Sequence, residues 1–226
     1  MIYKRYWVVF SLVTLASFAV LGGVGRRLIS HAPPIPNVYT TDGQLLFAGT
    51  YITDGQGVWQ SIGGQEVGTV WGHGAYVAPD WSADWIHRES EFLLNSWAQR
   101  EGGASFATLN ADQQAALKAR LIRTMRTNTY ETKGNRVTID TDRAAAFEDL
   151  EVYYAGVFAL GRKDYAIPPG ALTNVEKQHQ LAAFFWWTAW AASTDRPGST
   201  VTYTNNWPHE PLIGNQPTAE NMVWSV

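Results

Sequence analysis

The sequence predicts a mainly α-helical domain with minor short strands, preceded by one transmembrane helix. Two observations lead to this fold class. The first is an uncharged, apolar run from Tyr6 to Gly25 near the start of the chain. The second is a series of longer segments, each opened by a capping residue and most of them closed by a glycine, with apolar residues at helical spacing in several. Of the 226 residues, roughly 190 lie beyond the apolar run, which is enough for one generous domain or two small ones.

Residues 1–30 are expected to form the transmembrane helix. At 1.5 Å per residue, about 20 residues cross a hydrocarbon core of roughly 30 Å. A cleaved signal peptide is the alternative, but its small-x-small site at Ser30–Ala32 lies several residues past the apolar run. The positive-inside rule decides only weakly between the two orientations, because both ends of the apolar run have basic residues. These are Lys4 and Arg5 before the run and Arg26 and Arg27 after it. The very short leader favours a cytoplasmic N-terminus, a single pass in this chain and a domain outside the cytoplasm.

Residues 31–40 are expected to be a stiff, extended linker. Three prolines fall within four positions of HAPPIPNVYT, and proline fixes φ and removes a hydrogen-bond donor. Residues 41–216 then form the folded domain. In 217–226, AENMVWSV turns apolar again, so this segment is expected to begin a second membrane segment that is truncated here.

The first half of the domain contains two expected helices. GQLLFAG suits a short strand or a turn of helix. A short helix follows, with Thr53 or Asp54 as its cap and the pair Gly63 and Gly64 as its end. A longer helix is capped by Asp80 or Ser82 and ends at Gly102 and Gly103, with Ile86, Leu93 and Trp97 along one apolar stripe.

Three more helices are expected in the second half. The clearest by propensity begins at an Asn110 cap. GNRVTID reads as a turn and a short strand, and the next helix runs from a Thr141 cap to a Gly161 stop. The last begins at a Thr173 cap and ends at RPG. Its stretch Leu181–Ala192 is uncharged, too short to span a bilayer, and therefore expected to be buried or to lie against lipid.

Composition excludes several classes of protein. The net charge is −3, from 17 basic and 20 acidic side chains, so the chain lacks the clustered positive charge that nucleic acid requires. The absence of cysteine rules out disulfides, iron–sulfur clusters, cysteine-bound zinc and covalently attached c-type haem. The 11 tryptophans suggest packing at interfaces, wet or lipidic, because a buried indole N–H needs a partner.

One polar stripe could carry metal chemistry. Helical spacing places four side chains on one face: Asp80, Asp84, His87 and Glu91. A histidine with two carboxylates could hold a divalent metal. The favoured interpretation is a solvated face with Asp84–Arg88 and His87–Glu91 pairs, because nothing nearby supplies further ligands.

Two other clusters have a functional and a structural interpretation. The next helix has a basic side that consists of Lys118, Arg120, Arg123 and Arg126. This side could face anionic headgroups or an acidic partner, but an ordinary solvated face is favoured. A second cluster consists of Trp186, Trp187 and Trp190. It could line a sugar or quinone site, but core packing or membrane-interface anchoring is favoured.

The stretch TVWGHGAYVAPDW has the outline of a haem-attachment segment without its thiols. If His73 takes the histidine position of C-x-x-C-H, Thr69 and Gly72 stand where the two cysteines belong. No methionine suits a second axial ligand, since Met125 falls inside a predicted helix and the others lie at the chain ends. We therefore expect His73 to hydrogen-bond its neighbours in a tight turn that the glycines permit.

Two long stretches carry a family resemblance. TVWGHGAYVAPDWSADWIHRES resembles the N-terminal region of quinol-dependent nitric oxide reductases, and AAFFWWTAWAASTDRPGSTVTYTNNWPHEPLIGNQPT resembles a later part of that region. The remainder aligns in order. The resemblance implies a membrane helix followed by an extracytoplasmic domain of cytochrome-c-like fold without haem, here residues 41–216. It also implies a bacterial inner-membrane enzyme of denitrification that takes electrons from quinol and reduces two NO to N₂O.

The resemblance does not place a catalytic centre in this chain. Full-length members carry haem b and non-haem iron, held by histidines on membrane helices and an acidic side chain. The five histidines here lie outside the predicted membrane helix: His31, His73, His87, His179 and His209. We therefore assign no catalytic, cofactor-binding or metal residue, expect no cofactor in this chain, and leave open whether it acts as an enzyme.

The expected role is structural. The domain would cap the outer face of a haem–copper-oxidase-like helix bundle, with the helix around Trp186–Trp190 near the membrane surface. The expected partners are lipid and that bundle, with a homodimer left open and nucleic acid excluded. The alternative is a stand-alone, membrane-anchored periplasmic binding or sensory module. A soluble metalloenzyme would rest only on the stripe of Asp84, His87 and Glu91.

Overall fold

The computed structural model describes residues 2–30, 32–102 and 105–219. The chain divides into two compact units, one up to Pro34 and one from Ile35 onward. Most of the described residues are helical, and four short strands form one small sheet. The predicted mainly α-helical class with minor strands is therefore confirmed. The expected membrane segment at the C-terminal end, in 217–226, lies almost entirely outside the described residues.

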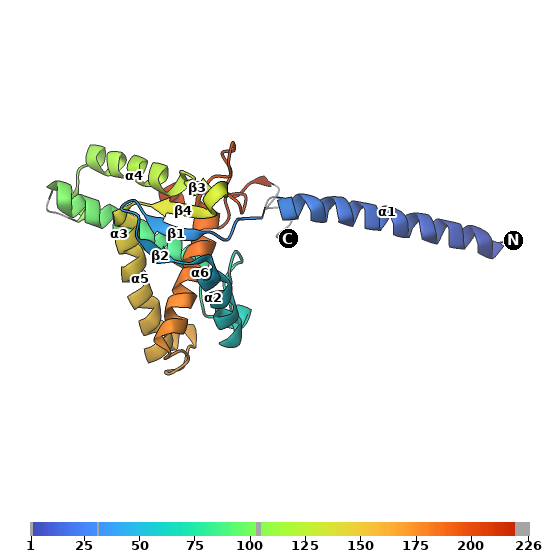
Figure 1. Ribbon diagram of the computed structural model, residues 1–226, viewed down its shortest axis with the longest axis horizontal. Helices are drawn as coiled ribbons and strands as arrows, with labels where there is room; N and C mark the ends of the chain where they lie inside the picture. Colours follow the sequence, from blue (N-terminus) through green and yellow to red (C-terminus); the bar gives the residue numbers. More distant parts are fainter. Residues whose placement is uncertain (1, 31, 103–104, 220–226) are drawn as a thin grey trace. The chain divides into compact units, whose positions relative to one another are not determined.

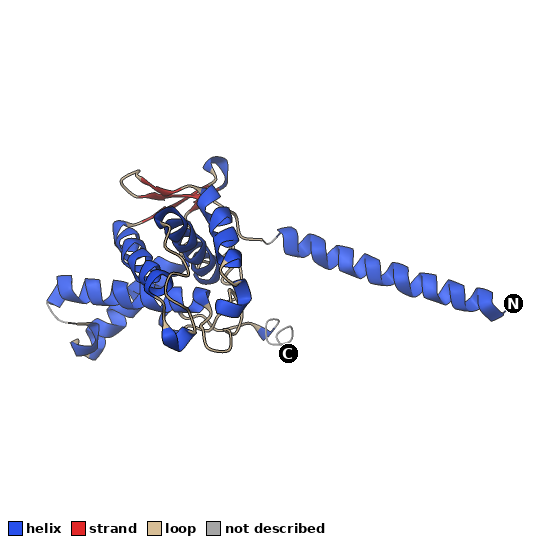
Figure 2. Cartoon of the chain, turned by 90° about the horizontal axis from the view of Figure 1, so that it is seen from below, coloured by secondary structure: helices blue, strands red, loops and turns tan. Residues whose placement is uncertain are grey.

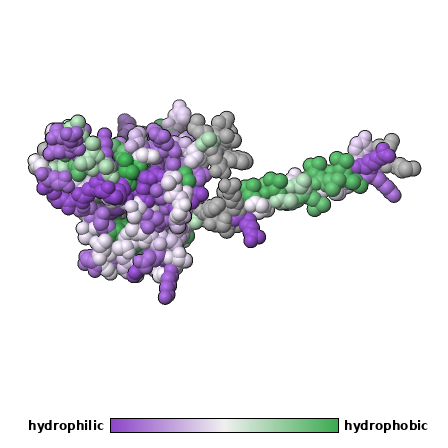
Figure 3. Space-filling model, turned by 90° about the horizontal axis from the view of Figure 1, so that it is seen from above, coloured by the Kyte–Doolittle hydropathy of each residue, from purple (hydrophilic) through white to green (hydrophobic). Residues whose placement is uncertain are grey.

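The first unit is the helix α1, Ile2–Ser30 (Figure 1). From Tyr3 to Arg26 it is long and apolar enough to cross a membrane. Its described side chains are almost all exposed within this unit, and Figure 3 shows an apolar surface along most of its length. These properties agree with the membrane helix expected in residues 1–30.

The second unit contains a mixed sheet with the strand order β2-β1-β4-β3. Its strands are β1 Asn37–Thr40, β2 Leu45–Phe47, β3 Tyr130–Glu131 and β4 Arg136–Ile139. The two central strands, β1 and β4, are parallel, with Val38 opposite Val137, and each edge strand pairs antiparallel with its neighbour. Figure 2 shows the sheet at one edge of the helical body.

The sheet corrects one boundary, because the expected linker 31–40 includes strand β1. The stiff proline segment stops at Pro36, and the following residues alternate between partly and fully buried positions, as a paired strand does. Val38 is completely buried. The folded unit thus begins at Ile35 rather than at 41.

Helix α2, Gly49–Ser61, begins earlier than the sequence predicts. The expected caps Thr53 and Asp54 lie inside the helix, and the N-cap position is Ala48, whose side chain makes no cap hydrogen bond. The missing acceptor comes from the sheet, since Asn37 Oδ1 accepts a hydrogen bond from the Gly49 N–H at 2.8 Å. A cap supplied by a distant residue leaves no local sequence signal.

The caps predicted for the next two helices are confirmed. Asp80 Oδ1 accepts a hydrogen bond from the Ala83 N–H at the start of α3, Trp81–Gly102. Asn110 forms a reciprocal capping box with Gln113 at the start of α4, Ala111–Arg126.

The last two helices start one residue away from the predicted caps. Asp140, not Thr141, caps α5, Thr141–Leu160, and Asn174, not Thr173, caps α6, Val175–Ser193. In both cases the capping side chain accepts a hydrogen bond from the N–H three residues later. Gly161 ends α5 with a positive φ of 79°, as its glycine predicts. The described residues also form five short 3₁₀ helices: η1 Gly64–Val67, η2 Phe106–Thr108, η3 Thr132–Gly134, η4 Lys163–Tyr165 and η5 Pro211–Ile213.

Helix α6 forms the centre of the second unit and packs against α2, α3 and α5 (Figure 1). Its residues are buried almost without a break from Leu181 to Ser193. Of the two predicted environments for this helix, the protein interior is therefore correct, and lipid contact is wrong for the buried residues. The apolar surface on all sides of α6 is covered by neighbouring helices.

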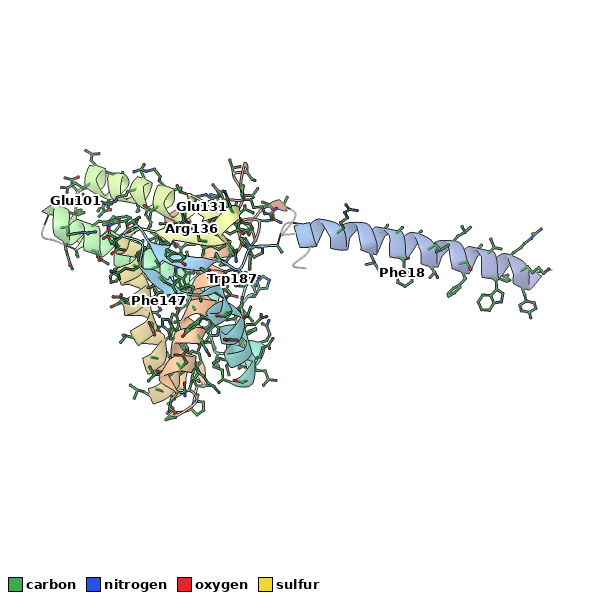
Figure 4. All side chains as sticks on the ribbon, in the orientation of Figure 1. Phe18, Glu101, Glu131, Arg136, Phe147 and Trp187 are labelled. Atoms are coloured by element: carbon green, nitrogen blue, oxygen red, sulfur yellow. The ribbon has the colours of Figure 1, made fainter. Side chains whose placement is uncertain are left out.

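Among the described residues, six tryptophans are buried in this core rather than at an interface. Five are almost inaccessible to solvent: Trp81, Trp85, Trp97, Trp186 and Trp190. Trp81 stacks on Phe185 with ring centroids 5.3 Å apart, and Trp85 stacks on Tyr154 at 5.2 Å. Phe147 also lies inside this cluster of rings (Figure 4). The expectation of wet or lipidic tryptophan packing is wrong for these five.

Candidate functional site

The loop between Thr69 and Asp80 is the segment that the sequence analysis compared with a haem-attachment site. It is closed at its base, where the Thr69 carbonyl accepts a hydrogen bond from the Trp81 N–H at 2.8 Å. Asp80, at the N-cap of α3, holds the interior. Its Oδ2 accepts hydrogen bonds from Thr69 Oγ1 at 2.7 Å and from the Gly72 N–H at 2.6 Å. The loop is therefore fixed by one buried carboxylate.

Aromatic side chains attach this loop to the rest of the domain. Trp71 donates its Nε1–H to the Thr188 carbonyl of α6 at 2.8 Å and packs on Trp187. Trp207, from the C-terminal loop, donates its Nε1–H to the Gly72 carbonyl at 3.0 Å. The exposed His73 ring lies edge-on to the Trp207 ring, with centroids 4.7 Å apart. Three segments distant in sequence thus meet at this loop.

The loop does not suit a covalently attached haem. Thr69 and Gly72, at the positions of the two thiols, both bind Asp80, and the chain has no cysteine to form a thioether. Met125 is completely buried in the core side of α4. As expected, glycine supports the tight turn, since Gly74 has a φ of +85°. The donor set for a c-type haem is therefore incomplete.

The polar stripe of α3 divides into separate structural contacts. Asp80 serves the loop, while Asp84 Oδ2 binds Arg88 Nε at 2.9 Å and the Tyr154 hydroxyl at 2.8 Å. His87 Nε2 lies 3.5 Å from Glu91, so the predicted i,i+4 pairs are confirmed. Across the described residues, no group of three or more histidine, aspartate or glutamate side chains could hold a metal ion. The metal interpretation of the stripe has no support.

His87 has a second acidic neighbour that the sequence does not reveal. Its Nδ1 lies 3.0 Å from Glu210 Oε2, a carboxylate that is mostly buried in the C-terminal loop. Glu210 also accepts a hydrogen bond from the Leu212 N–H. The contact ties α3 to a segment 123 residues later. Its role is to hold the C-terminal loop against the helix.

The basic side of α4 is not one solvated face. Arg126 turns inward and binds the C-terminal loop through Asp195 at 2.5 Å and Asn215 at 2.9 Å. Arg120 pairs with Glu101, which Figure 4 labels near the end of α3, and the Arg120 guanidinium lies over the Trp97 ring. Lys118 lies over the Phe106 ring, and Arg123 is exposed. Arg120 and Arg126 therefore form ion pairs within the protein, and the four cations do not form one headgroup-binding surface.

The tryptophan cluster of α6 is packing, as the favoured interpretation predicts. Trp186 and Trp190 are stacked with centroids 6.2 Å apart and are almost fully buried. Trp187 is partly buried against Trp71 and Phe184. These rings contact other aromatic side chains of the protein, which supports packing rather than a sugar or quinone site.

A shallow groove of about 400 Å³ runs between α3 and α5. Arg88, Phe92 and Asn95 line one side, and Asp149 and Tyr153 line the other. The Arg88 guanidinium lies 3.9 Å from the centre of the Tyr153 ring. Burial raises the pKa of Tyr153 to about 12, so its hydroxyl stays protonated at neutral pH.

A buried ion pair in the core is the feature that the sequence analysis missed. Arg143 Nε of α5 binds Glu89 Oε1 of α3 at 2.7 Å, and the two side chains are 5% and 1% exposed. Trp85 donates its Nε1–H to the other oxygen of Glu89 at 3.1 Å. The sequence contained a signal for this ion pair, because the charged residue Glu89 interrupts the apolar stripe of α3 between Ile86 and Leu93.

A second pair, His179 and Glu151, makes stability depend on pH. Their side chains are 2.7 Å apart and each is 26% exposed. The hydrogen bond to Glu151 raises the pKa of His179 above 6.5. A raised histidine pKa means that the stabilisation is complete below the unfolded-state pKa and is lost as pH rises through the folded-state pKa.

We therefore expect Glu151→Gln to destabilise the domain near pH 5.5 by about 0.5 kcal/mol and to have little effect near pH 8. Urea unfolding of the full chain, followed by tryptophan fluorescence at both pH values, measures the difference. Glu148→Gln, an exposed neighbour on α5, is the matched control. A Glu151→Gln effect that is equal at both pH values would contradict the role of His179.

Comparison with known protein families places this geometry in context. The family model for the NorB cytochrome c-like domain of nitric oxide reductase matches residues 36–209. The matched range covers well over half of the chain and contains the loop fixed by Asp80 as well as helices α2 to α6. No curated protein matches the chain.

Proposed function

This chain belongs to the family of the NorB cytochrome c-like domain of nitric oxide reductase, and on that premise we propose that it is a structural, haem-free part of a quinol-dependent nitric oxide reductase. The enzyme would reduce two NO to N₂O as a step of denitrification. The catalytic haem b and non-haem iron would belong to membrane helices of the same polypeptide, outside this chain. The domain would cap the outer face of those helices.

The observation that carries the proposal is the use of Asp80 in the loop. Its carboxylate holds Thr69 and Gly72, the two positions that would need thiols in a c-type cytochrome. On the proposed function, the domain would not relay electrons from a soluble donor through a covalent haem, and a membrane quinol would be the donor. No step of the reaction is assigned to a residue of this chain.

The termini of the folded unit support a capping role. Asn135 Nδ2 donates to the Ile35 carbonyl, where the unit begins, and the Thr218 N–H donates to the Asn205 carbonyl near the end of the described chain. Asn128 Nδ2 connects the sheet region to the C-terminal loop through the Asp195 carbonyl. These hydrogen bonds hold both ends of the folded unit in place. The proposed capping role would need such fixed ends, because they would connect the domain to membrane helices.

The proposed location is the bacterial inner membrane. Helix α1 would anchor the chain with its N-terminus in the cytoplasm, and the domain would lie in the periplasm or outside the cell. The tether is short, because only residues 27–34 separate the apolar span from the folded unit. Even fully extended, eight residues would reach at most about 29 Å, and residues 27–30 are shorter because they belong to α1, so the domain would stay close to the membrane surface.

A spectrum of the purified chain tests the haem-free role. We expect that the chain, expressed in a bacterium that matures c-type cytochromes and purified in detergent, shows no Soret absorption band and no haem-dependent peroxidase stain on a denaturing gel. A known c-type cytochrome produced in the same cells is the positive control. A Soret band that remains with the pure protein would contradict the proposal.

A further inference from the structure

The outward side of the C-terminal half of α5 is unusually apolar for an exposed helix. Val152 and Leu160 are 74% and 78% exposed. Ala155, Gly156 and Ala159 lie between them and are partly exposed. No atom beyond the helix lies within 4 Å of the position that a Cβ on Gly156 would occupy. These five residues are called the α5 outer face.

This face contrasts with the first half of the same helix. There the outward residues include the charged pair Glu148 and Asp149, as is usual for a surface helix. From Val152 to Gly161 the sequence has no charged side chain, while Tyr154, Val157 and Phe158 fill the inward side. A helix that is apolar on both sides is normally covered on both, and a contiguous exposed apolar surface marks a docking site.

We propose that the α5 outer face binds the same face of a second copy of this chain, with the two helices antiparallel across a two-fold axis at Gly156. In that arrangement, residues equally far before and after Gly156 lie opposite each other. Val152 then contacts the partner's Leu160, and Leu160 contacts the partner's Val152. The two large exposed side chains thereby cover each other, as a self-complementary two-fold interface requires. The small residues between them let the helices approach closely.

Charge favours the antiparallel second copy over a lipid surface. The acidic residues Glu148 and Asp149 lie before the face, and the exposed Lys163 of η4 follows it. Antiparallel pairing brings the acidic end of one copy towards the basic end of the other. Anionic lipid headgroups would instead meet the two carboxylates, which is unfavourable. Anchoring by α1 would raise the effective concentration of the copies, so a modest face suffices.

The absence of cysteine from the chain makes a specific test available. We would prepare the full chain with the single substitution Gly156→Cys in liposomes and treat it with a short bismaleimide. We expect a covalent dimer on a denaturing gel, because Gly156 lies next to the partner's Gly156 at the axis. Ala119→Cys, an exposed position on α4, is the matched control and should remain monomeric at the same protein density.

Two further variants separate this pairing from random collision. Adding Leu160→Glu to Gly156→Cys should abolish the covalent dimer, since the exposed side chain can change without affecting the core. Asp149→Lys should weaken cross-linking, and the added Lys163→Asp should restore it. The proposal is overturned if Gly156→Cys stays monomeric, if Ala119→Cys cross-links equally, or if Leu160→Glu leaves the dimer unchanged.

Discussion

Replacing Glu89 by alanine is expected to lower the free energy of unfolding by about 3–5 kcal/mol, the loss typical when one partner of a buried ion pair is removed. The substitution leaves the Arg143 guanidinium in the core without its carboxylate. It also removes the acceptor of the Trp85 indole N–H. Within the described part of the chain, Arg143 Nη2 already has no hydrogen-bond partner, so the structure offers the orphaned cation no ready replacement.

Chemical unfolding of the full chain in detergent, followed by tryptophan fluorescence, measures this loss. Glu91→Ala is the matched control, because Glu91 lies on the same helix but is exposed, and we expect a change within about 0.5 kcal/mol. The double variant Glu89→Leu with Arg143→Met should recover much of the stability, since a packed apolar pair can replace a buried ion pair. A loss below about 1 kcal/mol for Glu89→Ala would show that water reaches Arg143.

The sequence predicted those parts of the fold that depend on neighbouring residues. The caps Asp80 and Asn110 act within one helical turn, so their residue types were sufficient. The parallel pairing of Asn37–Thr40 with Arg136–Ile139 joins segments about a hundred residues apart, and no local pattern distinguishes that strand from an extended linker. The start of α2 was misplaced for the same reason, because its first free N–H binds Asn37.

The same distinction applies to the candidate site. The i,i+4 pairs of α3 were predictable, because helical spacing alone brings Asp84 to Arg88. The contacts that give these residues their roles are long-range: Asp84 with Tyr154, His87 with Glu210, and Arg126 with Asp195. Asp84, His87 and Arg126, which could have contributed to ligand sites, each have instead a partner from a distant segment. The residue types indicated several chemistries, whereas the contacts observed for these three side chains connect elements of the fold.

Gly55→Ala is expected to destabilise the domain by about 3 kcal/mol, although alanine is the better helix former. Gly55 lies on the buried side of α2, where a Cβ would be 1.9 Å from the Gln180 carbonyl oxygen and 2.8 Å from the Phe184 Cβ. The obstacle is largely the backbone of α6, which cannot rotate away as a side chain could. The two helices would have to separate, and the packing of Trp59 on Phe184 would loosen.

Gly57→Ala supplies the matched control on the same helix. A Cβ at Gly57 would meet no atom within 4 Å, so only the helix propensity changes there. We expect Gly57→Ala to stabilise the domain by up to about 1 kcal/mol, opposite in sign to Gly55→Ala. Thermal unfolding of both variants and the original chain, under one set of conditions, gives the comparison. If both glycines tolerated alanine equally, the close approach of α2 to α6 would be wrong, and with it the buried position of α6 that holds Trp71 and the Asp80 loop in place.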